Sequence, residues 1–96
     1  MMPRAETLAL ARDLDEDTRR LVREMATCND DYRPFVRTLA ADADLPVERA
    51  RQILRTLGAQ GLATYGPVRD EDDGRPMGST WWLTERGAAL QQVLGK

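Results

Sequence analysis

The sequence predicts a mainly α-helical fold with one small β-hairpin: a three-helix core, the hairpin and a short final helix. Apolar residues recur at helical spacing in three successive stretches before residue 60. The turn signal Asp70–Gly74 then separates two short predicted strands. The last stretch opens on Thr84-Glu85, a pair that favours a helix start. A chain of 96 residues has room for one such domain and not for two cores.

The composition is that of a soluble globular protein, with 42% hydrophobic and 31% charged residues. No apolar run approaches the roughly 18 residues that cross a membrane. The first residues turn acidic where a signal peptide stays apolar. The single cysteine, Cys28, cannot form an internal disulfide and fits a reducing compartment. We therefore expect a cytoplasmic protein.

The residue types present do not favour catalysis. The chain contains no histidine, which removes the commonest general base and the commonest metal ligand. We find neither a glycine-rich phosphate loop nor a paired catalytic set. The acidic cluster Asp15–Asp17 has no matching ligands elsewhere in the sequence. We therefore expect no enzyme activity, no cofactor and no metal.

Residues 1–28 form an N-terminal helical segment in this interpretation. Helical spacing runs from about Ala5 to Thr27 and places Leu10, Leu14, Leu21 and Met25 on one face. The cluster at residues 15–17 allows two interpretations. It is the solvated surface of one long helix, or it is a break at which Asp17 caps a new helix that starts at Thr18.

Residues 32–60 have the layout of a helix-turn-helix, whose second helix is offered to the DNA major groove. Pro34 suits the first turn of a helix that extends to Ala43. Asp44 then occupies a corner that favours positive φ. Pro46 opens the next helix, and Gly61 follows it as a C-terminal cap. Its apolar face contains Val47, Ala50, Leu54 and Leu57.

Residues 62–84 form the hairpin, and residues 85–95 form the final helix. We expect a first strand at 62–65, which Gly66-Pro67 interrupts or bends, and a return strand at 79–83. Alternation places Trp81 and Leu83 on one face of the return strand and Trp82 on the other. Trp82 either packs against the first or last helix or contacts a partner, which is another subunit or a different protein.

This pattern resembles the winged helix-turn-helix fold, and more narrowly the MarR and PadR groups of bacterial transcriptional regulators. The resemblance covers roughly residues 32–94. Its motifs are Leu39-Ala40-x-x-Ala43-x-Leu45, Gly61-Leu62, Asp70-x-x-Asp73-x-Arg75, Gly74-Arg75-Pro76 and Trp81-Trp82-Leu83-Thr84-Glu85-Arg86-Gly87-x-x-Leu90. The last motif is similar to the aromatic-x-Leu-Thr-x-x-Gly-x-x-Leu ending of the family.

The resemblance implies sequence-specific binding of double-stranded DNA by a small transcriptional regulator. The third helix would enter the major groove, and the hairpin, or wing, would lie near the minor groove, with an aspartate holding Arg75 at the tip. Arginine suits guanine and phosphate, and glutamine suits adenine. The candidate DNA-binding residues are Arg33, Arg37, Arg49, Arg51, Gln52, Arg55, Arg69 and Arg75.

Other interpretations of the same surfaces stay open. The charged side chains of the third helix could form an ordinary solvated face, and residues 70–74 could form a simple soluble turn. The net charge of −2, the acidic hairpin tip and Trp82 favour a winged helix that binds a protein partner without DNA. We also expect a homodimer, because a dimer reads two DNA half-sites and is therefore more specific for its DNA sequence than a monomer. Its candidate interface residues are Leu8, Leu10, Leu14, Leu90, Val93 and Leu94.

Overall fold

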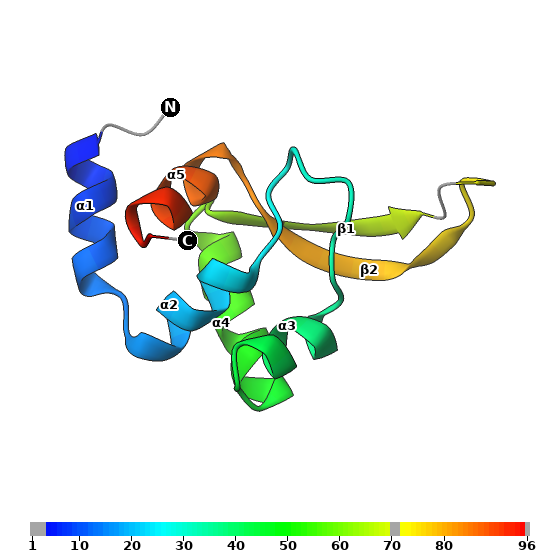
Figure 1. Ribbon diagram of the computed structural model, residues 1–96, viewed down its shortest axis with the longest axis horizontal. Helices are drawn as coiled ribbons and strands as arrows, with labels where there is room; N and C mark the ends of the chain where they lie inside the picture. Colours follow the sequence, from blue (N-terminus) through cyan, green and yellow to red (C-terminus); the bar gives the residue numbers. More distant parts are fainter. Residues whose placement is uncertain (1–3, 70–71, 96) are drawn as a thin grey trace.

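Five helices and one two-stranded antiparallel hairpin make up the part of the chain that the computed structural model describes, residues 4–69 and 72–95. The helices gather at one end of the molecule, and the hairpin extends away from them (Figure 1). The elements are α1 (Arg4–Asp13), α2 (Glu16–Glu24), α3 (Val36–Asp42), α4 (Val47–Ala59), β1 (Ala63–Arg69), β2 (Pro76–Leu83) and α5 (Glu85–Val93).

The acidic cluster near residue 15 is a break between two helices. The Asp15 carboxylate accepts a hydrogen bond from the Thr18 backbone N–H at 2.8 Å, and it caps the first turn of α2. Of the two interpretations of the sequence, the break is therefore correct, but the capping residue is Asp15 and not Asp17. The Arg19 guanidinium donates to the carbonyls of Ala11 and Leu14 at 2.8 and 3.2 Å, which satisfies backbone acceptors at the end of α1.

The helix predicted to begin at Pro34 begins two residues later. Phe35 has an extended backbone, with φ −72° and ψ 161°, and precedes the first helical residue, Val36. The Pro34 carbonyl accepts a hydrogen bond from the Thr80 hydroxyl at 2.8 Å in a buried position. In a helix that began at Pro34, this carbonyl would accept an intrahelical hydrogen bond, but here it accepts from β2. The prediction of a helix from Pro34 was therefore wrong.

Left-handed residues end α3 and α4 as the sequence predicts. Asp44 has φ 58° and Gly61 has φ 74°. In each case the following amide donates to a helix carbonyl five residues earlier, at 2.8 Å for Leu45 and 2.9 Å for Leu62. These are Schellman motifs, which satisfy carbonyls at the helix end and turn the chain sharply. The first motif sets the corner between α3 and α4, which contact each other.

The hairpin is longer than expected because Gly66-Pro67 does not end its first strand. β1 continues through both residues to Arg69, and Pro67 pairs with Ser79 in the register. A proline is tolerated in a strand whose N–H faces away from the ladder. A side chain at Gly66 would collide with the ring of Trp82, so glycine is required for close packing here.

Residues 25–35 contact the last part of β2. The Leu83 N–H donates to the Ala26 carbonyl at 2.9 Å, and Thr27 forms an isolated parallel bridge with Leu83. The same stretch supplies the Pro34 carbonyl to the Thr80 hydroxyl. The strand edge at Leu83 is therefore not open for pairing with another chain. This link also attaches the end of α2 to the base of the hairpin.

One hydrophobic core joins all the helices to the base of the hairpin. Thr84 caps α5, as predicted, with its hydroxyl accepting from the Gly87 N–H at 3.3 Å. No helix in the described ranges is both long and apolar enough to cross a membrane. The fully buried large side chains are Leu21, Val22, Met25, Leu39, Leu54, Leu57, Leu62, Thr80, Leu83 and Leu90.

Candidate nucleic-acid interface

An open groove separates α3 and α4 from the hairpin. Three arginines of the two helices line it: Arg37 on α3, and Arg51 and Arg55 on α4. Residues at 51 and 55 are one helical turn apart and therefore lie on the same face of α4. The opposite wall comes from the hairpin and from the residue before α3. Its large apolar side chains are Phe35, Tyr65, Met77 and Trp81.

The groove is basic in a protein whose net charge is −2. Three arginines against one glutamate, Glu48, give its lining a net charge of +2. The Arg51 guanidinium pairs with the Glu48 carboxylate at 2.8 Å, but both side chains are exposed, and such a pair is worth little. Among the described residues, Arg37 and Arg55 form no ion pair. Both are exposed and free to meet an anion.

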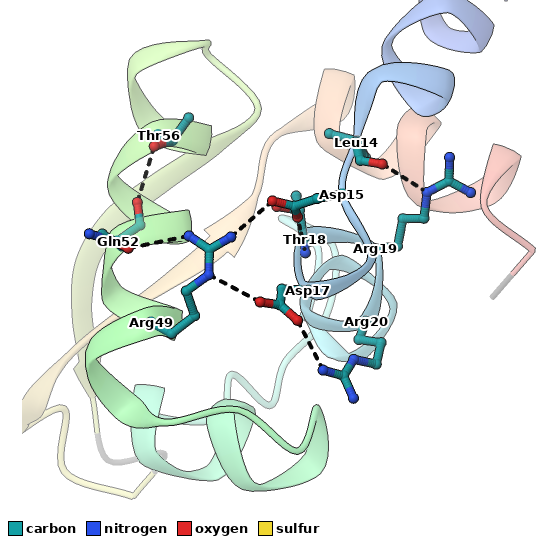
Figure 2. Close-up of polar contacts among 9 residues, drawn as sticks. All are labelled: Leu14, Asp15, Asp17, Thr18, Arg19, Arg20, Arg49, Gln52 and Thr56. Atoms are coloured by element: carbon teal, nitrogen blue, oxygen red, sulfur yellow. Dashed lines mark hydrogen bonds and ion pairs between the residues drawn. The ribbon is translucent and has the colours of Figure 1, made fainter.

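Arg49 lies on the opposite flank of α4 and faces α2. Its guanidinium pairs with the carboxylates of Asp15 at 2.9 Å and Asp17 at 3.1 Å (Figure 2). Asp17 also pairs with Arg20 at 3.0 Å. We call the group of Asp15, Asp17 and Arg49 the α2–α4 latch. Arg49, which we had expected to contact DNA, is therefore engaged within the protein.

The latch lowers the pKa of both aspartates. Hydrogen bonds from Thr18 hold the pKa of Asp15 below its usual range, and the charge and hydrogen bond of Arg49 lower it further. Hydrogen bonds from Arg49 and then from Arg20 lower the pKa of Asp17. Both carboxylates are therefore charged at neutral pH, when they hold Arg49 away from the groove.

Gln52 sits on the exposed face of α4 beside the latch. Its side-chain carbonyl accepts a hydrogen bond from Arg49 at 3.2 Å, and its backbone carbonyl accepts from the Thr56 hydroxyl at 3.1 Å (Figure 2). Only the oxygen of the amide can accept from a guanidinium, so the amide NH₂ is the end left for an outside acceptor. Gln52 therefore remains a candidate DNA-binding residue, and its hydrogen bond with Arg49 sets the orientation of its amide.

Arg33 covers Trp82 and does not point into the groove. The centre of its guanidinium lies 4.0 Å from the centroid of the Trp82 ring, which is a cation–π contact. The guanidinium also donates to the Cys28 carbonyl at 3.2 Å. The sequence predicts that Arg33 contacts DNA and that the first helix, the last helix or a partner covers Trp82. The structure instead gives Trp82 its cover from Arg33.

The hairpin tip presents Arg75 as the resemblance implied. Its Nε lies 3.6 Å from the Asp73 carboxylate, and its backbone N–H donates to the same carboxylate at 2.9 Å. The Arg75 side chain is 80% exposed, so it can still reach a ligand. Arg69 is nearby, with its guanidinium donating to the Gly74 carbonyl at 3.2 Å. Asp70 and Glu71 of the predicted tip lie outside the described residues.

The residues expected at a dimer interface do not form one surface. Leu90 is fully buried in the core, so its assignment to that interface was wrong. Three more, Leu10, Leu14 and Leu94, are partly buried and pack against the core of their own chain. This packing follows from the contact between α1 and α5 (Figure 1). Only Leu8 and Val93 are exposed, at 42% and 36%.

Sequence reasoning missed the exposed apolar residues of the groove. Tyr65 and Met77 are 58% and 57% exposed, and Phe35 is 38% exposed. The register pairs Tyr65 with Trp81, so the two rings share a face of the hairpin. Strand alternation combined with the turn position could have identified this pair. The exposure of Phe35 could not be found in this way, because it depends on where α3 begins.

Comparison with known proteins leaves the structure as the basis for assigning a function. No family model, curated protein or solved structure matches the chain. Within residues 4–69 and 72–95, no group of three or more metal-ligating side chains comes together. The groove between α4 and the hairpin combines positive charge with an open shape.

Proposed function

We propose that the chain is a small winged-helix transcriptional regulator that binds double-stranded DNA. In this proposal α4 enters the major groove, and the hairpin lies near the minor groove with Arg75 at its tip. The observation that carries the proposal is the concentration of exposed arginines in the groove of an acidic protein. Arg37, Arg51 and Arg55 supply positive charge where a phosphate strand would pass between helix and hairpin.

Two further features support the proposal. The tight corner at Asp44 between α3 and α4 is compatible with a helix-turn-helix. The hairpin extends from the helical body on the side of the molecule away from α1 (Figure 1). We retain Gln52 and Arg69 as secondary contacts and leave out Arg33 and Arg49, which are engaged within the protein. A homodimer remains part of the proposal, and of the expected interface residues Leu8 and Val93 are the two that stay exposed.

The first test is the salt dependence of binding to a fluorescent random-sequence duplex, measured by polarisation at about 50 and 200 mM salt. Three phosphate contacts predict a loss of affinity of about 40-fold across this range, because each contact releases counterions. Arg55→Gln should reduce the slope of log K against log salt by about 0.9.

The matched control for this test is Arg12→Gln, which removes one exposed arginine from α1. It changes the net charge by the same amount but lies outside the groove, so the slope should stay close to that of the parent protein. Equal effects of the two variants would contradict the proposed interface. An absence of duplex binding at low salt would contradict the function itself.

A second candidate function is a winged helix that binds a protein partner without DNA. The observation that favours it is the exposed apolar wall of the groove, formed by Phe35, Tyr65 and Met77. Reversal of charge at Arg51 and Arg55 to glutamate separates the two candidates. If the biological activity survives this change, DNA binding is not the function.

A further inference from the structure

The hairpin wall of the groove is an aromatic platform. The ring centroids of Tyr65 and Trp81 lie 5.2 Å apart with their planes tilted by 58°, so the two rings support each other. Trp81 in turn packs against Gly58 of α4, which fixes its position. Phe35 lies against Gly78 of β2 at the other side of the wall. These aromatic faces are held in place by the fold and are not loose surface residues.

The platform remains open to solvent although it is strongly apolar. Tyr65 is 58% exposed and Met77 57% exposed, and both belong to the same groove as Phe35. A contiguous apolar surface with a polar rim is typical of a binding site. The rim consists of Arg37, Arg51 and Arg55. The occupant that fits both features is anionic and carries flat apolar groups.

We propose that this groove binds unpaired nucleotides, with bases stacked on the side chains of Tyr65 and Phe35 and phosphates at Arg37 and Arg55. Aromatic side chains beside a basic groove are the recognition mode of single-stranded nucleic acid. The inference rests on the proposed nucleic-acid function and adds a preference for strand state. Bases within a duplex stack on one another, so a duplex can use the arginines but leaves the platform empty.

The test compares three probes of equal length by fluorescence polarisation at about 50 mM salt. They are a 12-nucleotide oligothymidine, a strand of the same length with an abasic site at each position, and a 12-base-pair duplex. The abasic strand keeps the phosphates and removes the bases. We expect the oligothymidine to bind at least about 5-fold more tightly than the abasic strand, because stacking contributes on the order of a tenfold factor per base.

Two tyrosine variants provide matched controls. Tyr65→Ala removes a platform ring, whereas Tyr32→Ala removes a ring that is 73% exposed and does not line the groove. We expect Tyr65→Ala to weaken oligothymidine binding about 5-fold or more and to leave duplex binding nearly unchanged. Tyr65→Phe keeps the ring and should restore binding. Circular dichroism of each variant shows whether the fold is intact.

The outcomes separate this inference from the proposed function. Equal binding of the oligothymidine and abasic strands would overturn it, as would an equal effect of Tyr65→Ala and Tyr32→Ala. Duplex binding without oligothymidine binding would also overturn it while leaving the proposed function intact. A peptide rich in aspartate, leucine and phenylalanine serves as the competitor. If it binds through Tyr65 and the oligothymidine does not, the groove is a protein-binding site and the inference is wrong.

Discussion

Gly58 occupies a turn of α4 where alanine would be the better helix former by up to ~1 kcal/mol. The structure shows why glycine is present. A Cβ atom at this position would lie 2.6 Å from Cζ3 of Trp81, inside the distance at which carbon atoms can pack. The glycine therefore weakens the helix slightly and allows the aromatic ring of the hairpin to approach it.

We expect Gly58→Ala to destabilise the protein by about 1 kcal/mol, because an overpacking cost of about 1–3 kcal/mol exceeds the gain in helix propensity. Urea unfolding measures the change. In a Trp81→Leu background the smaller side chain leaves room for the methyl group, and the same substitution should become neutral or stabilising. A stabilising effect of Gly58→Ala in the parent protein would show that the Trp81 ring moves at little cost.

Local chemistry determines which residues could be placed from the sequence. The positive φ values of Asp44 and Gly61 follow from turn residues at the ends of apolar helical periods, and both were predicted. The start of α3 was not predicted correctly, because the Thr80 hydroxyl, 46 positions away in the chain, donates a hydrogen bond to the Pro34 carbonyl. A hydrogen bond between distant segments leaves no local pattern, so it cannot be read from neighbouring residues.

Among the helices, α2 and α5 are joined by one buried glutamine. The Gln91 amide NH₂ donates to the carbonyls of Val22 and Met25 at 2.9 and 2.8 Å, at the end of α2. The Val22 carbonyl also accepts from the Met25 backbone N–H at 3.2 Å, so Gln91 adds a second hydrogen bond there, whereas at Met25 it supplies a donor to a carbonyl beyond the last residue of α2. Leu90 and Gln91, which are neighbours on α5, are both buried.

We expect Gln91→Ala to destabilise the fold by about 1–3 kcal/mol, because the buried Met25 loses the amide donor to its carbonyl and the Val22 carbonyl loses one of its two donors. Gln92→Ala is the matched control, since Gln92 is exposed on the same helix. Thermal or urea unfolding of both variants makes the comparison. Similar stabilities for the two would show that water replaces the glutamine.

The α2–α4 latch makes the contact between these helices sensitive to acid. The pKa values of Asp15 and Asp17 are lowered in the folded chain, whereas an unfolded aspartate titrates near pH 3.9. Lowered pKa values stabilise the folded state above the unfolded pKa, and this contribution is lost as the pH falls through the folded values. The latch is therefore complete at neutral pH and weakens below about pH 4.

We expect Arg49→Gln to lower the urea midpoint at pH 7, and this difference from the parent protein should shrink as the pH falls below about 4. The reason is that protonated aspartates no longer attract the guanidinium. Arg12→Gln, the control outside the latch, should show no such pH dependence. A difference that stays constant between pH 7 and pH 3 would mean that Arg49 acts through packing and not through charge.

At the scale of the whole molecule, charge is divided between two flanks of α4. One flank carries Arg49, neutralised by the aspartates of α2, and the other carries Arg51 and Arg55 at the open groove. The sequence showed all three arginines on one helix, but it could not show which of them had a partner. That distinction depends on how α2 packs, and the break at Asp15 sets this packing.

The expected dimer interface also shows that the sequence does not reveal which residues pack against each other. Apolar residues near residues 10 and 90 were assigned to contacts between subunits, but α1 and α5 contact each other within one chain. An apolar stripe identifies a buried face without identifying what buries it. The succession of helices, hairpin and final helix was predicted, because helical period and strand alternation encode it locally, but the division of residues 1–28 into two helices was one of two interpretations.

The Gln91 link also bears on how the protein folds during its synthesis. Gln91 contacts carbonyls that lie 69 and 66 positions earlier in the chain. At a translation rate of about 5–20 residues per second, the ribosome releases α2 roughly 3–14 s before its partner. The ribosome makes α4 and the hairpin during that interval, before α5 is available to complete the core. Nascent chains therefore expose apolar surface, which chaperones can bind until α5 docks.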